Sequence, residues 1–148
     1  MRACGQRGFT LTELVIVLVL VGILAAFVVP RIDIEGFERQ AFASELTNAL
    51  RYAQKSAIAS GCHVRATVDA ADDSYALVYT GAGGSTCGGG SAALPHPTRG
   101  GPFTGGGEID GGGSVVFDAM GRTAAGLSIT LSSGDVILVE PETGYVHD

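Results

Sequence analysis

Tryptophan is absent from the sequence, and aromatic and basic residues are scarce. Aromatic residues make up 7% of the 148 positions, charged residues make up 16%, and the formal net charge is -6. No two basic residues are adjacent. Because nucleic acid and anionic lipid surfaces are bound through clustered Lys and Arg, this composition argues against a general affinity for either. The length allows one domain, and the shortage of large side chains predicts a small, modestly packed head.

Motifs for catalysis and phosphate binding are missing as well. The glycine-rich stretches lack the Lys and Ser/Thr of a phosphate-binding loop and do not stand between a strand and a helix, so we interpret them as loop filler. Neither a nucleophile elbow nor a Cys/His pairing is present. The sequence therefore predicts no catalytic residues, no cofactor and no enzymatic activity.

Possible metal ligands do not form a recognisable pattern. The three histidines show no metal-ligand spacing and are expected to face solvent: His63, His96 and His147. Three aspartates lie close together in the chain and carry the hard oxygen ligands that calcium prefers: Asp69, Asp72 and Asp73. A polar hairpin turn has the same composition. We favour the turn, and no metal site is predicted.

A long apolar run begins directly after Glu13. Every residue from 14 to 29 is apolar or Gly. As a helix, residues 9–29 would measure about 32 Å, which is enough to cross a hydrocarbon core of about 30 Å. Arg2 and Arg7 favour a cytoplasmic N-terminus, and no small-x-small cleavage site follows the run. We expect a retained transmembrane helix with the head on the other side.

A second, amphipathic helix is predicted over residues 31–61. Pro30 removes one backbone donor and is expected to kink the first helix rather than end it, because helical periodicity resumes soon after. Six apolar residues share one helical stripe: Phe42, Leu46, Ala49, Leu50, Ala53 and Ala57. Gly61 is expected to end the helix. The stripe should therefore pack against the head.

Short alternating stretches indicate a β-rich head over residues 62–148. Residues 62–69 alternate between apolar and polar, and a polar turn leads into a second strand at 74–80. Further strands are predicted at 114–118, 127–132, 136–140 and 145–147, separated by turns that each contain Gly. The predicted fold class is α+β, with a long N-terminal helix packed on a small antiparallel, β-sandwich-like head.

Residues 81–113 are dominated by glycine. Gly occupies 14 of these 33 positions, and three prolines interrupt the segment. Such a composition predicts a long surface loop without secondary structure of its own.

The N-terminal stretch "GFTLTE", together with the apolar run after it, resembles the class III signal of type IV pilins and type II secretion pseudopilins. In those proteins a prepilin peptidase cuts after the Gly and methylates the new N-terminal Phe. The resemblance covers about thirty residues and implies a leader of residues 1–8, with cleavage between Gly8 and Phe9. It also implies a transmembrane assembly helix over residues 9–30. Glu13 would be the fifth mature residue and Pro30 the twenty-second.

Cleavage would give Glu13 a partner. A carboxylate at the edge of the bilayer normally needs an opposite charge, and the cut creates a cationic amine at Phe9. The two groups lie about one helical turn apart within one chain. In a staggered assembly, the amine of an entering subunit can instead reach Glu13 of its neighbour, and the charge then specifies register. The alternative is a signal anchor with an unrelated acid near its start.

The sequence has three cysteines, an odd number. Removal of the leader would take Cys4 away and leave Cys62 and Cys87. In an oxidising compartment these two are expected to pair, closing a 24-residue interval with a stabilisation of about 3 kcal/mol. Two reduced, buried thiols are the alternative, since loop geometry cannot be read from the sequence.

The second half of the chain carries a further resemblance. The segment "VVFDAMGRTAAGLSITLSSGDVILVEPETGYV" is similar to the domain shared by the H-type minor pseudopilin (GspH) of type II secretion and FimT-like minor pilins, through its "FD..GR" turn and final "TG.V". The stretch "LRYAQKSAIASGC" points the same way. One Cys at the first strand and another in the following loop resemble minor pilins of mannose-sensitive haemagglutinin pili.

These resemblances imply a minor pilin or pseudopilin. Such a subunit inserts through its N-terminal helix into a type IV pilus or a type II secretion pseudopilus and helps to prime or cap assembly. Its implied partners are the prepilin peptidase, other pilin or pseudopilin subunits and the bacterial inner membrane. The N-terminus would be cytoplasmic and the head periplasmic.

The alternative is a binding module carried on such a fibre, acting in adhesion through the glycine-rich loop or in DNA uptake. DNA binding needs exposed Lys and Arg near the C-terminus, where "EPETGYVHD" is acidic. Loss of the leader would leave seven basic residues (nine minus two) against fifteen acidic ones. No nucleic-acid partner is expected.

Overall fold

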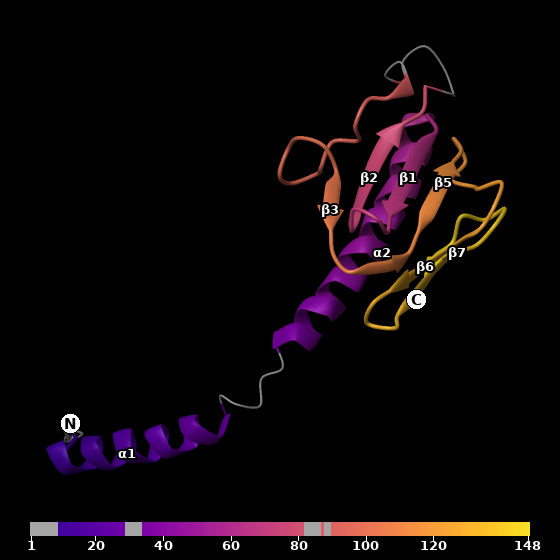
Figure 1. The fold of residues 1–148 in the computed structure, drawn as a ribbon. Coiled ribbons are helices and arrows are strands. Elements are labelled where there is room, and N and C mark those ends of the chain that lie inside the picture. Colours follow the sequence, from indigo (N-terminus) through magenta and orange to yellow (C-terminus); the bar gives the residue numbers. More distant parts are fainter. Residues whose placement is uncertain (1–8, 29–33, 82–86, 88–89) are drawn as a thin grey trace, which may run out of the picture. The chain divides into compact units, whose positions relative to one another are not determined.

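The computed structural model describes residues 9–28, 34–81, 87 and 90–148 (Figure 1). The chain divides into two compact units, residues 1–34 and residues 35–148, and each is described by itself. We call the second unit the head. The predicted strands and most of the predicted amphipathic helix lie in the head, so the predicted fold class is compared with the structure of the head.

Helix α1 spans Leu11–Val28 and makes up most of the described part of the first unit. Its large apolar side chains from Leu11 to Leu24 are exposed on every side of the helix. Within the described ranges, no helix meets the combined length and hydropathy expected of a membrane crossing. The predicted kink at Pro30 lies outside the described residues.

Helix α2 spans Ile34–Ser60 and packs its apolar stripe into the head. Leu46, Ala49, Leu50, Ala53 and Ala57 are all at most 1% exposed, and Phe42 packs against the same core at the edge of the stripe. Gly61 follows with φ of 67°, a left-handed conformation that suits glycine and ends the helix. The predicted amphipathic helix and its buried face are confirmed.

The first sheet has the strand order β3-β2-β1-β5 and is antiparallel throughout (Figure 1). Its strands are β3 (Thr104–Gly106), β2 (Ser74–Tyr79), β1 (Val64–Asp69) and β5 (Gly113–Phe117). Along β1 the burial alternates strictly, because Val64, Ala66 and Val68 face the core and their neighbours face out. The predicted alternation is therefore confirmed.

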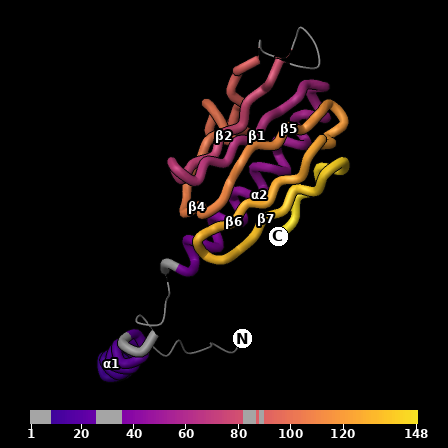
Figure 2. The backbone as a smooth tube through the Cα atoms, turned by 45° about the vertical axis from the view of Figure 1, so that its right-hand side comes forward, coloured from indigo at the N-terminus to yellow at the C-terminus, as the bar shows by residue number. Residues whose placement is uncertain are grey.

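The second sheet has the order β4-β6-β7-β8 and is also antiparallel. Its strands are β4 (Ile109–Gly111), β6 (Leu127–Leu131), β7 (Val136–Val139) and β8 (Val146–His147). Strands β5 and β6 are in contact, so the two sheets meet there (Figure 2). Inward side chains of both sheets join the α2 stripe in one hydrophobic core. This arrangement is the predicted α+β class.

The glycine-rich segment is more ordered than predicted. It contributes β3 and β4, where the sequence indicated only a loop. A Cβ added at Gly105 would lie 2.5 Å from the Tyr75 ring, and one at Gly107 would lie 2.5 Å from the Phe42 ring. Interpreting these glycines as loop filler was therefore wrong, because they let the backbone lie directly against aromatic rings.

Candidate processing and assembly site

Helix α1 begins with a capping arrangement formed by Thr10 and Glu13. The backbone N–H of Glu13 donates to the Thr10 carbonyl at 3.1 Å and to the Thr10 hydroxyl oxygen at 3.3 Å. A Thr followed three residues later by Glu is the sequence signature of a helix start. The Glu13 carboxylate also lies in the first turn, where the helix dipole favours negative charge. The stretch "TLTE" carries this signature, although no helix start was predicted from it.

The predicted cleavage point borders this cap. Phe9 precedes the helix and is 75% exposed, and Thr10 is exposed as well. Gly8 lies outside the described residues. An exposed, non-helical residue directly before a capped helix is accessible to a peptidase, which acts most readily on extended and exposed chain.

Glu13 is the only ionisable residue of α1, and the last turn of the helix contains no basic residue. The large apolar side chains around it, from Phe9 to Leu24, are exposed. A helix that is apolar all round is stable only where lipid or other protein covers it. Glu13 is therefore the one position on α1 from which a charged side chain can make a contact.

In the head, the three stretches that carry the second resemblance converge on Gln54. The Gln54 side-chain amide donates to the Gly121 carbonyl at 2.9 Å and to the Thr143 carbonyl at 3.2 Å. One turn earlier on α2, the Arg51 guanidinium donates to the Val146 carbonyl at 3.1 and 3.3 Å. Helix α2 thus fixes both the "FD..GR" turn and the "TG.V" segment through their backbones.

The "FD..GR" turn is held from within by Asp118. One carboxylate oxygen accepts from the backbone N–H groups of Arg122 and Met120, both at 2.8 Å, and the other lies 3.3 Å from the Arg122 guanidinium. The backbone hydrogen bond from Arg122, followed by that from Met120 and the guanidinium charge, holds the pKa of Asp118 below its usual value. The carboxylate therefore stays ionised as the fixed centre of the turn.

Glycines allow the two turns to touch. Gly121 has φ of 75° and Gly144 has φ of 64°, both in the left-handed region. A Cβ at Gly144 would collide with the Gly121 carbonyl oxygen, and one at Gly121 would lie 2.6 Å from the Ile58 side chain. The motif glycines are thus required by close approach as well as by backbone conformation.

Cys62 and Cys87 form a disulfide with Cα atoms 5.5 Å apart. Both cysteines are buried, at 4% and 3% exposure. The bridge ties the start of the first sheet to the glycine-rich segment. It therefore restrains that segment at a point well before β3.

The remaining candidate ligands are used within the head. Asp69 accepts from the Ala71 backbone N–H at 2.8 Å, and Asp73 accepts from the Ile109 backbone N–H at 3.0 Å. Across the described part of the chain, no three His, Cys, Asp or Glu side chains gather in a metal-binding group. The three histidines are each partly exposed to solvent: His63, His96 and His147.

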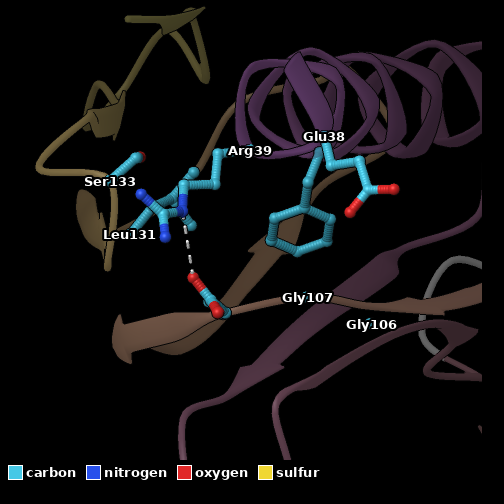
Figure 3. Close-up of a pocket in the computed structure, with 8 residues that line it drawn as sticks. Glu38, Arg39, Gly106, Gly107, Leu131 and Ser133 are labelled. Carbon is cyan, nitrogen blue, oxygen red and sulfur yellow. Dashed lines mark ion pairs between the residues drawn. The ribbon is translucent and has the colours of Figure 1, made fainter. Parts of the chain in front are cut away.

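A hollow of about 480 Å³ lies between the first part of α2 and the second sheet (Figure 3). Arg39 and Glu108 form an ion pair across it at 3.5 Å, and their side chains are 48% and 64% exposed. A pair this exposed contributes at most about 1 kcal/mol. The hollow has a polar, solvated mouth, and nothing in its lining selects a particular ligand.

Comparison with known protein families and proteins gives two family matches. The prokaryotic N-terminal methylation motif matches residues 4–29, and type II transport protein GspH matches residues 43–144. Two proteins of Pseudomonas aeruginosa, each called fimbrial protein, are 36% identical to this chain over 77 residues. That alignment covers 51% of this chain and 50% of each relative, so the chain spans about half the length of the curated relatives it matches. No solved structure matches.

The GspH match begins in the first half of α2 and ends at the Gly144 turn. It contains both sheets almost entirely and both contacts of Gln54, whereas Val146, the partner of Arg51, lies just beyond it. Because this match covers well over half of the residues, the chain belongs to the type II transport protein GspH family.

Proposed function

We propose that this protein is a structural subunit of a type IV pilus or a type II secretion pseudopilus. A prepilin peptidase cuts between Gly8 and Phe9 and methylates the Phe9 amine. Before assembly the mature subunit lies in the inner membrane with its head in the periplasm, and it then enters the fibre through α1. It acts as a minor subunit that primes or caps assembly.

The observation that carries the proposal is the uncovered apolar surface of α1. Side chains from Leu11 to Leu24 are about half exposed or more on every face. Each buried CH₂ group contributes about 0.8 kcal/mol, so covering the apolar side chains of α1 stabilises an assembly more than any single contact of the head. Lipid covers such a helix before assembly, and the helices of neighbouring subunits cover it afterwards.

Glu13 gives this otherwise non-directional association a register. In an apolar surrounding, an unpaired carboxylate costs several kcal/mol, and a neighbouring subunit's Phe9 amine removes that cost at one axial position only. The capping contact to Thr10 uses the Glu13 backbone N–H, so it leaves the carboxylate available. Helix initiation and register can therefore be separated by mutation.

The register role is tested with Glu13→Gln. Gln retains the N3 side-chain shape and hydrogen-bonding ability, so α1 still begins at the same residue, but the charge is lost. We expect normal membrane insertion and at least a tenfold fall in the amount recovered in sheared fibres, because breaking a buried ion pair costs about 3 kcal/mol or more. Asp72→Asn, which removes an exposed head charge, is the matched control.

Quantitative immunoblots of membrane and fibre fractions provide the measurement. If Glu13→Gln enters fibres in normal amounts, Glu13 does not set the register between subunits. A loss that also occurs with Asp72→Asn would show that fibre entry depends on net charge and would equally contradict the proposal.

A further inference from the structure

A groove of about 510 Å³ lies between α2 and the segment 95–103 of the head. Its size falls within the range of about 300–1,000 Å³ that ligand sites occupy. Unlike the hollow described above, it combines a set of stacked rings with unpaired hydrogen-bond donors. We call it the ring groove, and a ligand there would extend the protein's role beyond the structural function proposed above.

The floor of the ring groove is a three-ring stack. The Phe103 ring stacks on Tyr52 at a centroid distance of 5.2 Å and on His96 at 4.6 Å, with interplanar angles of 27° and 30°. Phe103 is 7% exposed, so the outer two rings cover it. The Tyr52 hydroxyl donates to the Pro95 carbonyl at 3.2 Å and fixes the stack to the loop. The result is a rigid platform of rings, whose partly exposed outer members, Tyr52 and His96, line the groove.

His96 offers a donor at this platform. Its Nδ1 accepts from the backbone N–H groups of Thr98 and Arg99, at 3.2 and 3.1 Å. An accepting Nδ1 requires the proton to be on Nε2 in the neutral ring. Among the described residues, Nε2 has no hydrogen-bond partner of its own, so its N–H is available to a ligand.

Positive charge gathers at the same groove although the head is acidic. Residues 35–148 contain thirteen acidic and six basic side chains. Lys55 and Arg51 both line the ring groove, whereas Glu45 is its only acidic member. Lys55 is exposed and, within the described part of the chain, has no ion-pair or hydrogen-bond partner. Glu45 is already engaged by the Tyr75 hydroxyl at 2.8 Å.

We propose that the ring groove binds an acidic saccharide. One face of a sugar ring presents C–H groups that pack on an apolar platform, while its hydroxyls point outward to side chains such as Asn48 and the His96 Nε2–H. The saccharide carboxylate forms an ion pair with Lys55. The Arg51 guanidinium, held by the Val146 carbonyl, adds positive potential to the groove. An uncharged, hydroxyl-free ligand would leave these polar groups unsatisfied.

Two other ligand classes fit the groove less well. An extended peptide needs a free strand edge, but the loop backbone is already paired, with Phe103 donating to Leu94 at 2.7 Å and His96 donating to Gly101 at 2.9 Å. On the other side of the groove, residues 45–55 lie in the interior of α2, where backbone groups pair within the helix. Single-stranded nucleic acid is bound by a row of cations along several phosphates, whereas this groove has two cations close together in an acidic head.

The test titrates the full chain in detergent micelles with trigalacturonate, using maltotriose as the neutral probe and isothermal titration calorimetry as the measurement. We expect binding of trigalacturonate that is at least tenfold tighter than that of maltotriose and that weakens with added salt. Lys55→Gln should weaken binding of trigalacturonate about tenfold, because one charge-assisted hydrogen bond is lost. Tyr52→Leu should weaken both probes.

Arg65→Gln, which removes an exposed cation from β1, is the matched control and should bind like the wild type. Far-UV circular dichroism checks that each variant is folded, and Lys55→Gln decides the question if Tyr52→Leu is not. Absence of trigalacturonate binding, equal binding of maltotriose, or equal losses in Lys55→Gln and Arg65→Gln would each overturn the proposal. Tighter, Lys55-dependent binding of oligothymidylate would overturn it in favour of nucleic acid. None of these outcomes depends on fibre entry.

Discussion

Gly105 in β3 lies against the ring of Tyr75, and replacing it with Ala tests the account of the glycine-rich segment. The added Cβ would stand 2.5 Å from both Cε1 and the hydroxyl oxygen of Tyr75. That ring is 2% exposed and lies between Phe42 and Phe103, each with its centroid 6.4 Å away. The Tyr75 hydroxyl is also fixed to Glu45. The ring therefore has no room to move aside.

The magnitude follows from two opposing effects. Forcing an extra methyl group into a packed site costs about 1–3 kcal/mol, and a contact at 2.5 Å belongs near the upper end. Ala also reduces the entropy of the unfolded chain, which offsets about 0.4–1 kcal/mol of that cost. We expect a net loss of about 2 kcal/mol, or a fall of about 8 °C in Tm for a head of this size.

Urea or thermal unfolding of the full chain in micelles, followed by near-UV circular dichroism, provides the assay. The signal is followed in the tyrosine band, because the sequence has no tryptophan and all four tyrosines lie in the head, so this band reports the head. Gly111→Ala is the matched control, because its Cβ would meet Thr130 at an ordinary 3.6 Å. Its stability should be unchanged or slightly raised.

A double-mutant cycle locates the cause. In a Tyr75→Leu background the ring is gone, and Gly105→Ala should then cost less than about 0.5 kcal/mol. If Gly105→Ala is as stable as the wild type, or if its cost is the same in both backgrounds, the close approach of β3 to Tyr75 is not what the glycine serves.

Three further predictions concern the head. Gln54→Ala should destabilise it by about 1–3 kcal/mol, since the carbonyls of two turns lose their shared donor. Gln54→Glu should show a similar loss in urea unfolding, and unchanged stability of both variants would contradict the bridging role. Replacing Cys62 and Cys87 together by Ser should cost about 3 kcal/mol, and an unchanged unfolding midpoint under non-reducing conditions would count against the bridge. Burial, followed by the hydrogen bond and charge of Glu45, raises the pKa of Tyr75 in the folded state. The stability that protonated Tyr75 contributes is therefore complete below pH about 10 and is lost as the pH rises above that value. Tyr75→Phe should reduce the fall of unfolding free energy with alkaline pH, and an identical pH dependence in both proteins would refute the assignment.

The helices and the longer strands were predictable because their side chains repeat with a clear period. Val64, Ala66 and Val68 alternate with polar neighbours, and the α2 stripe recurs every three to four residues. Strands β3 and β4 were not predictable in this way, because Gly has no side chain and gives no alternation. The Tyr75 ring fills the space that Gly105 leaves in β3, and the Phe42 ring fills the space at Gly107 between the two strands.

The candidate site divides in the same way. The register of Gly8, Phe9 and Glu13 is a local pattern and can be read from one stretch of sequence. The bridge from Gln54 to Gly121 and Thr143 joins residues 67 and 89 positions apart, and no local signal marks it. The ring groove likewise depends on a contact between α2 and a loop about forty residues further along the chain, so composition alone suggested only an unstructured loop there.

The mass of the N-terminal peptide tests the central claim most directly. Protein extracted from membranes of cells with an active prepilin peptidase is digested and analysed by mass spectrometry. The account predicts that the chain begins at Phe9 and carries one methyl group on its amine. A chain that still begins at Met1 in those cells, or that begins at any residue within α1, would contradict it.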